Sequence, residues 1–248
     1  MRVKAYTLVF LLLRAFLSLG LARGAELTAD EILNKAVNNT YPETYQMAAQ
    51  MVSTKQDKED RVYKMEIFKK GSDKMLIVFT EPAREKDRKI LRNGNSIWMY
   101  IPNVQKVLKV AEKQSVMGGD FSNADLMRLD LVSDYNASLA GEEKMDGVNA
   151  YRLELKAKDR SVAYDRVTVW VRKDNLLPMK NEFYTLSGKL LKILTYSDLK
   201  RLAGQVRPTK MTMENTLEEG QLTIFTFDDL KIKDTLPDNI FTQTYLSR

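Results

Sequence analysis

The chain of 248 residues contains no histidine and no cysteine, which excludes an imidazole base, a thiolate nucleophile, an ordinary zinc site and every disulfide. Its 39 basic and 33 acidic side chains give a formal net charge of +6, and four of the basic residues fall within the first 24 positions. The remaining chain therefore carries only +2, which is too weak a charge to indicate a nucleic-acid partner.

The N-terminus has the pattern of a secretory signal peptide. Two basic residues precede a mostly apolar stretch over residues 5–21, and residues 22–24 offer small side chains at the two positions that a signal peptidase reads. We expect cleavage before Ala25, with a signal peptide over residues 1–24 and one domain over residues 25–248. An arginine within the apolar stretch weighs against the alternative, a retained membrane anchor. The expected location is the periplasm.

A helix is predicted over Thr28–Asn38. Thr28 and Glu31 have the spacing of a capping box, in which each residue hydrogen-bonds to the other's backbone. The apolar residues between positions 32 and 37 then fall on one stripe of the helix, which is the face that it would bury.

Beyond Pro42 the spacing of apolar residues changes from the period of a helix to the period of a strand. Alternation of apolar and polar residues predicts antiparallel strands with one covered and one wet face. It occurs at Tyr45–Met51, Tyr63–Ile67, Tyr151–Leu155, Val167–Val171 and Met211–Met213. Further strands are predicted at Met75–Thr80, Lys89–Arg92, Ser96–Ile101, Val104–Val110, Met179–Tyr184, Leu190–Leu199 and Gln221–Phe227. Turn signals separate them at residues 71–73, 93–95, 102–103, 146–147, 187–189 and 219–220.

About a dozen consecutive strands with only two or three helices predict one large, curved antiparallel sheet rather than βαβ units, in the α+β class. Such a sheet has open edges and an apolar face that must be covered. The helices predicted at Thr28–Asn38 and Asn123–Leu131 are the segments available to cover it. Because the chain shows no linker, low-complexity tract or internal repeat, we expect a single domain.

The most specific pattern lies within Ser96–Leu126. The letters W-M-Y-I-P at residues 98–102 are followed by M-G-G-D-F-S-N-A-D-L at residues 117–126, where the two glycines predict a reversal and Ser122–Asp125 predicts a capping box. This pattern resembles the outer-membrane lipoprotein-sorting proteins of the LolA-like superfamily. The resemblance implies an unclosed, highly curved antiparallel β-barrel, or half-barrel. A few helices would cover its concave apolar face and leave a cavity for acyl chains.

Candidate cavity residues lie on the apolar sides of the predicted strands. Methionine is unbranched and adaptable, so it suits a surface that repacks around variable guests, although it is also the commonest filler of an irregular core. The cavity candidates are Met47, Met51, Tyr63, Met65, Ile67, Leu153, Met211 and Met213. Paired glycines before a capped segment can absorb large backbone changes, so Met117–Leu131 is predicted to be a movable lid. The lid candidates are Met117, Gly118, Gly119, Phe121 and Leu126.

Two other features each allow two interpretations, and two more have one. The charged run Arg84–Lys89 is either a solvated loop or a rim that meets head groups or an acidic partner. Trp170 is either a contact residue on the outer face or buried beneath neighbouring arginine stems. Trp98, within an all-apolar run, is expected in the core beneath a helix. Asp120–Asp125 lacks the spacing of an EF-hand, so it is interpreted as a helix cap and no metal is expected.

The sequence therefore predicts a protein without catalytic activity and without a cofactor. The resemblance implies a monomeric periplasmic carrier that shields the acyl chains of lipoproteins during transport toward the outer membrane. An inner-membrane exporter and an outer-membrane acceptor would be its partners. One alternative is a phospholipid or glycolipid shuttle that works with an inner-membrane exporter. A second alternative is a sensor or protein-binding module on the same fold.

Overall fold

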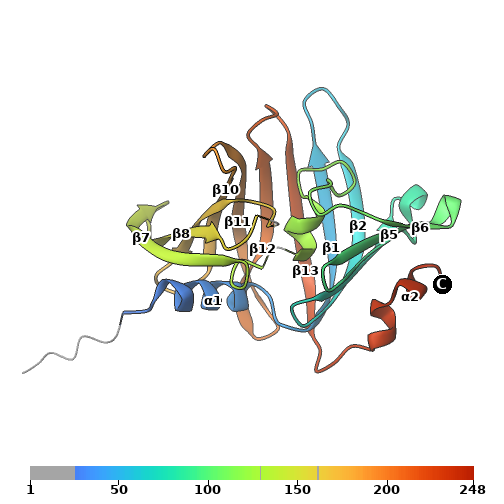
Figure 1. Ribbon diagram of the computed structural model, residues 1–248, viewed down its shortest axis with the longest axis horizontal. Helices are drawn as coiled ribbons and strands as arrows, with labels where there is room; N and C mark the ends of the chain where they lie inside the picture. The colour runs from blue at the N-terminus through green and yellow to red at the C-terminus, as the bar shows by residue number, and fades with distance from the viewer. Residues whose placement is uncertain (1–25, 129, 161) are drawn as a thin grey trace, which may run out of the picture.

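A single curved, open β-sheet dominates the computed structural model, which describes residues 26–128, 130–160 and 162–248 (Figure 1). Thirteen strands are arranged in the order β6-β5-β4-β3-β2-β1-β13-β12-β11-β10-β9-β8-β7, so the sheet ends at β6 and β7 and does not close into a barrel. Every pairing is antiparallel. This confirms the predicted half-barrel. The predicted signal peptide, residues 1–24, lies outside the described residues.

The elements follow one another as consecutive hairpins after an initial helix. They are α1 (Ala29–Thr40), β1 (Tyr45–Thr54), β2 (Arg61–Lys70), β3 (Lys74–Glu81), β4 (Lys89–Asn93), β5 (Ser96–Ile101), β6 (Lys106–Lys109), β7 (Tyr135–Met145), β8 (Val148–Ala157), β9 (Arg166–Arg172), β10 (Pro178–Tyr184), β11 (Leu190–Leu202), β12 (Gln205–Asn215), β13 (Leu222–Ile232) and α2 (Gln243–Leu246). Short 3₁₀ turns occupy Ala83–Glu85, Pro102–Val104 and Asp238–Phe241, and one π turn occupies Ala124–Arg128.

The first and last strands in the sequence, β1 and β13, pair with each other inside the sheet. Tyr45 lies opposite Ile232, and Thr54 lies opposite Leu222. All other pairings join strands that are neighbours in the sequence, and turn residues marked about half of these hairpins correctly. This one long-range pairing places the β1–β2 turn beside the β12–β13 turn.

Three local predictions need correction. The strand β7 was not predicted, because it is an edge strand whose side chains are mostly exposed and whose apolar alternation is therefore weak. The strand expected from Val104 begins only at Lys106, because Pro102–Val104 form a 3₁₀ turn. The helix expected over Asn123–Leu131 is a single π turn at Ala124–Arg128 within the described residues.

The main core lies on the concave face of the sheet. Two segments cover this face: α1, which packs against β7, β9, β10 and β12, and the lid segment, defined here as residues 110–134 between β6 and β7 (Figure 1). The helix buries Ile32, Leu33 and Ala36. The lid segment buries Val116, Phe121 and Met127 against the same cluster. The two predicted covers of the concave face are therefore confirmed, the second as an irregular segment.

A second, smaller core lies on the convex face. The chain after β13 turns back over β3–β5, where Phe241 and Leu246 pack against Leu76 and Leu91. Trp98 packs against this cluster as well, which confirms its predicted place beneath a helix and explains why its strand is apolar on both faces. In the described part of the chain, no helix has the length and apolarity needed to cross a membrane.

Candidate functional site

The concave face carries continuous rows of apolar side chains, because the strand register places inward-pointing residues opposite one another. One row runs from Met211 through Phe225 and Met51 to Tyr63, across β12, β13, β1 and β2. A second row crosses six strands: Leu230, Met47, Ile67, Ile77, Ile90 and Met99. The predicted cavity residues are thus part of one apolar surface.

All eight cavity candidates lie in this core, and each is between 0% and 6% exposed. Seven of them gather on β1, β2 and β12, with β13 between β1 and β12. Leu153 lies on β8, in the other half of the sheet. Met75 and Met99 occupy the same face and were not identified from the sequence. Their strands are covered on both faces, which removes the alternation that reveals an inward position.

The lid segment closes over these rows and fills the space above them. Phe121 is buried, with its ring centroid 6.2 Å from that of Phe225. Met117 and Leu126 are half-buried against the core, while Gly118 is exposed and Gly119 is buried. Residues 117–120 of the lid segment contact β2 and β13, and Asp125 contacts Lys192 of β11.

The two glycines are required by the close approach of the lid segment to the sheet. Gly118 has a φ of +73°, and a Cβ at this position would lie 2.8 Å from Nη1 of Arg61. A Cβ on Gly119 would lie 3.0 Å from Oγ1 of Thr223. These contacts explain the glycine pair in the closed arrangement, and the hinge motion stays a prediction.

Polar side chains of the sheet hold residues 117–120 of the lid segment. The guanidinium of Arg61 donates to the carbonyl oxygens of Gly118, at 2.7 Å, and Met117, at 3.2 Å. Thr223 donates from Oγ1 to the carboxylate of the buried Asp120, at 2.7 Å, and accepts from its backbone N–H. Gln221 donates to the other oxygen of that carboxylate. The carboxylate is therefore bonded at both oxygens.

The π turn of the lid segment is held through Asp125. Its carboxylate accepts from the Ser122 backbone, and its own N–H donates to the Ser122 hydroxyl, which confirms the predicted capping box. Tyr164 donates to one oxygen at 2.7 Å, and Lys192 forms an ion pair with the other at 2.8 Å. Burial, followed by the charge of Asp125, raises the pKa of Tyr164 far above its ordinary value, so the hydroxyl stays protonated and donates. Arg92 binds the carbonyl of Met127 at 2.7 Å.

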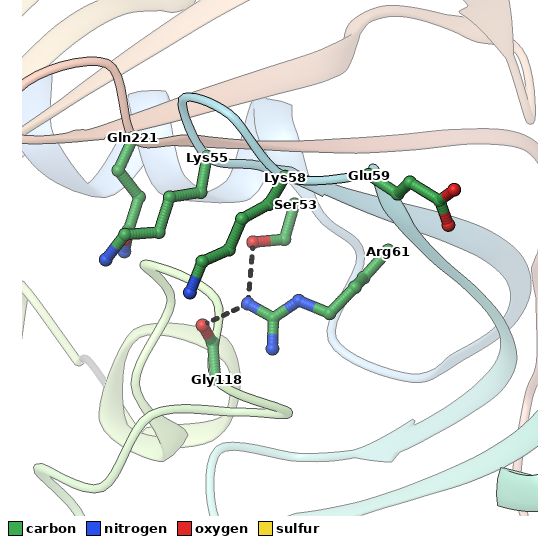
Figure 2. A pocket seen from close by; sticks show the side chains of 7 residues that line it. All are labelled: Ser53, Lys55, Lys58, Glu59, Arg61, Gly118 and Gln221. Carbon is green, nitrogen blue, oxygen red and sulfur yellow. Dashed lines mark hydrogen bonds between the residues drawn. The ribbon is translucent and has the colours of Figure 1, made fainter.

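A polar pocket of about 250 Å³ lies at the edge of the concave face, beside Gly118 (Figure 2). It is lined by Ser53, Lys55, Lys58, Glu59, Arg61, Gly118 and Gln221. Sequence reasoning missed this pocket and considered the charged run at residues 84–89 as the rim instead. The only local signal was the charge of the β1–β2 turn, and the mixed signs of that turn resemble any solvated loop.

The charged run and Trp170 have structural explanations. Residues 83–87 form a largely exposed turn between β3 and β4, as the solvated-loop interpretation expected. Lys89 leaves this turn and binds the carbonyl oxygen of Leu246 at 3.1 Å on the convex side. Trp170 is buried, donates to the carboxylate of Glu143, and has Nζ of Lys180 3.9 Å from its ring centroid.

The arrangement offers surfaces that could bind a ligand. Among the described residues, no group of three or more acidic side chains could hold a metal ion, in a chain without histidine and cysteine. What the geometry does provide is an apolar surface, a segment that covers it, and a polar pocket where the two meet.

Comparisons with known proteins place these features in a family. A family model described only as an uncharacterized protein matches residues 71–248. The crystal structure of a LolA superfamily protein from Nitrosomonas europaea is 34% identical, with a TM-score of 0.81 over 89% of this chain and 100% of that one. A DUF1329 family protein from Desulfovibrio piger is 27% identical, with a TM-score of 0.80 over 88% and 97% of the two chains.

A third structure shares the fold. It is a domain from Vibrio parahaemolyticus assigned to outer-membrane lipoprotein sorting, 24% identical, with a TM-score of 0.78 over 89% of this chain and 98% of that one. Among curated proteins, none matches the sequence.

Proposed function

The chain belongs to the LolA superfamily, and from this premise we propose that it is a carrier that buries the acyl chains of lipoproteins against the concave face of its sheet. The observation that carries the proposal is the composition of that face. Seven strand methionines lie on it, in an open sheet with a separate segment above them: Met47, Met51, Met65, Met75, Met99, Met211 and Met213. Flexible thioether side chains can adjust to guests of different shape.

Energetics favour an exchange between the lid segment and an acyl chain. Burying one CH₂ group is worth about 0.8 kcal/mol, so an acyl chain needs cover in water. The lid segment already buries Phe121 and Met127 on the apolar face. An acyl chain that replaced these side chains would exchange one apolar contact for another. The small net free energy of such an exchange suits a carrier, which must release its cargo as well as bind it.

The proposed cellular setting is the periplasm, with residues 1–24 removed as a signal peptide. The Vibrio parahaemolyticus domain, which shares the fold, is assigned to outer-membrane lipoprotein sorting, and this supports transport toward the outer membrane. An inner-membrane exporter would load the monomeric carrier and an outer-membrane acceptor would unload it. No catalytic step is proposed, because the chain has no histidine or cysteine and no recognisable catalytic motif among its other residues.

The direct test is mass spectrometry of an organic extract of the protein, purified from its native host without detergent. We expect a lipoprotein-derived acyl group in the extract. A phospholipid or glycolipid in its place would favour the shuttle alternative. An extract without lipid, from a protein that also takes up no fluorescent fatty acid, would favour the sensor or protein-binding alternative.

A disulfide across the lid contact gives a second, sharper test. A Cβ atom added to Gly119 would lie 3.0 Å from Oγ1 and 3.5 Å from Cγ2 of Thr223, the two atoms that Cβ of Thr223 carries. This proximity is within the reach of a disulfide, and the natural chain has no cysteine to interfere. We expect oxidised Gly119→Cys/Thr223→Cys to lose uptake of a fluorescent fatty acid.

Reduction of the same protein should restore uptake, so the reduced double variant is the matched control. The two single variants report any effect of losing the Thr223 hydroxyl or the glycine. Equal uptake by the oxidised and reduced proteins would show that acyl chains do not enter beneath the lid segment.

A further inference from the structure

The polar pocket beside Gly118 gathers cationic groups that the lipid carrier proposal does not use. Lys55 and Lys58 come from the β1–β2 turn, and Arg61 is the first residue of β2. Figure 2 shows the side chain of Lys58 extending toward Gly118 and the guanidinium of Arg61, while Lys55 and Gln221 line the other side of the pocket. The amino group of Lys58 and the guanidinium of Arg61 thus face a backbone carbonyl of the lid segment, that of Gly118.

Two of these cations have no carboxylate among their described contacts in the pocket. Arg61 is bonded to neutral oxygens, the carbonyls of Met117 and Gly118 and the hydroxyl of Ser53. Lys58 is exposed and directs its amino group into the pocket (Figure 2). Lys55 differs, because its amino group lies 2.6 Å from Glu218.

The acidic residues nearby are directed elsewhere or already bonded. The carboxylate of Glu59 points away from the pocket interior (Figure 2). Both oxygens of Asp120 accept hydrogen bonds, from Thr223 and Gln221. Asp57 and Asp60 are exposed in the same turn and do not line the pocket. The interior therefore presents positive charge and N–H donors, a combination that favours an anion.

We propose that this pocket binds the phosphate of an anionic lipid head group whose acyl chains lie on the concave face. The proposal rests on the acyl-chain binding proposed above and extends the cargo beyond lipoproteins, whose lipid anchor carries no phosphate. Arginine binds phosphate through two parallel N–H donors, and lysine adds a compact positive charge. Pockets that enclose a whole drug-sized ligand span about 300–1,000 Å³. The pocket of about 250 Å³ is smaller, so it fits a head group and leaves the acyl chains to the sheet.

Binding of a phosphate would also act on the lid segment. The guanidinium of Arg61 now holds the carbonyls of Met117 and Gly118. The present acceptors are neutral carbonyl oxygens, so a phosphate, whose oxygens carry negative charge, would compete well for the same donors. Head-group binding would then loosen the lid where the acyl chains must enter. By linkage, an opened lid would in turn raise the affinity for the head group.

The test compares two fluorescent lipids with the same acyl chains, phosphatidic acid and diacylglycerol, which differ only in the phosphate. We expect the wild-type protein to bind phosphatidic acid more tightly, and Lys58→Gln to weaken that binding about tenfold, as for loss of a charged hydrogen bond. Binding of diacylglycerol should be unchanged in Lys58→Gln. The matched control is Lys144→Gln, an exposed lysine on the edge strand β7, which should change neither affinity.

Three outcomes separate this proposal from the carrier function. Equal affinity for the two lipids, or an equal loss of both in Lys58→Gln, would overturn the phosphate site and leave the carrier function standing. Binding of neither lipid would overturn this proposal and leave the lipoprotein carrier function to be decided by the extraction experiment. Inorganic phosphate should compete with phosphatidic acid alone. If it binds through Lys58 while the lipids bind equally, the pocket is a site for free phosphate and the head-group proposal is wrong.

Discussion

The helix α1 and the lid segment cover the same concave face, but they are stabilised in different ways. α1 is a twelve-residue helix with a complete capping box, in which Thr28 accepts from the backbone of Glu31 and the carboxylate of Glu31 accepts from the backbone of Thr28. At its other end, Arg207 binds the carbonyl of Asn39 at 2.9 Å. Most of its backbone hydrogen bonds lie within the helix and its caps. Packing on the sheet therefore adds to a helix whose backbone groups are already paired.

The lid segment depends on side chains of the sheet instead. Its regular structure is one bridge, between Ser115 and Ser122, and one π turn. Its position is set by bonds from Arg61, Thr223 and Arg92 to its backbone or its carboxylates. Such bonds can be exchanged for bonds to a ligand without unfolding the segment. The difference identifies α1 as part of the fold, and the lid segment as the cover that we predict to move.

The largest effect is expected for removal of the apolar anchor of α1. Ile32→Ala should lower the free energy of unfolding by about 2–5 kcal/mol, because Ile32 is fully buried and its loss leaves a cavity. Chemical denaturation measures this change. Val37→Ala, on the exposed side of the same helix, is the control and should stay within about 0.5 kcal/mol. Similar losses in the two variants would show that α1 is not fixed by its packing.

Hydrogen exchange should separate the lid segment from the strands. We expect amides in residues 117–131 to open about a hundredfold more readily than those of Tyr151–Leu155 in β8, roughly 2.8 kcal/mol in opening free energy. The reason is that the lid segment lacks the continuous backbone ladder that protects β8. Core-like protection across residues 117–131, with and without lipid, would make the lid segment a fixed plug.

Loss of the Arg61 bonds should open the lid further. Arg61→Gln removes a charged donor from the carbonyls of Met117 and Gly118, so we expect the opening free energy of residues 117–121 to fall by about 1.5–3 kcal/mol. Exchange rates of these amides measure the effect. Lys64→Gln, whose ion pair with Glu81 is exposed, should change stability by less than about 1 kcal/mol and leave the lid unaffected.

A methyl group on Gly118 tests whether the glycine serves the closed arrangement. Gly118→Ala should cost about 1–2 kcal/mol for its positive φ, and the added Cβ should displace Arg61 and speed exchange in the lid segment. Gly94→Ala is the matched control, because Gly94 has a φ of +59° and no atom within 4 Å of an added Cβ. Gly94→Ala should lower the free energy of unfolding through backbone strain alone, without changing hydrogen exchange in the lid segment. Identical behaviour of the two variants would contradict the close-approach explanation.

The smallest effect is expected from pH, at the start of α1. Hydrogen bonds from the Thr28 backbone and side chain hold the pKa of Glu31 below its usual 4.5. Because the folded-state pKa is depressed, the stabilisation is present above pH 4.5 and is lost as the pH falls through the folded-state value. Thermal melting between pH 5 and pH 3 should therefore show a slightly steeper loss for the wild type than for Glu31→Gln. Parallel curves would mean that the capping box adds nothing measurable.

Much of the fold followed from local sequence patterns. The helix α1 with its capping box, most of the strands and about half of the hairpin turns were predicted, because alternation, caps and turn residues act over a few neighbouring positions. The strand β7 escaped prediction since an exposed edge strand needs no apolar alternation. The cavity candidates share one face as predicted, and the structure adds Met75 and Met99 to that face.

The sequence by itself determined the hairpin order, the inward position of five of the seven strand methionines, the helix cap and the absence of disulfides. Only the tertiary structure decided what meets at the edge of the concave face. Arg61 and Gly118 are 57 positions apart, and Asp120 and Thr223 are 103 apart. Their contacts depend on the curvature of the sheet and on the pairing of β1 with β13. The curvature adds up from small twists between many strand pairs, and the β1–β13 register joins distant parts of the chain. No short stretch of residues encodes either one.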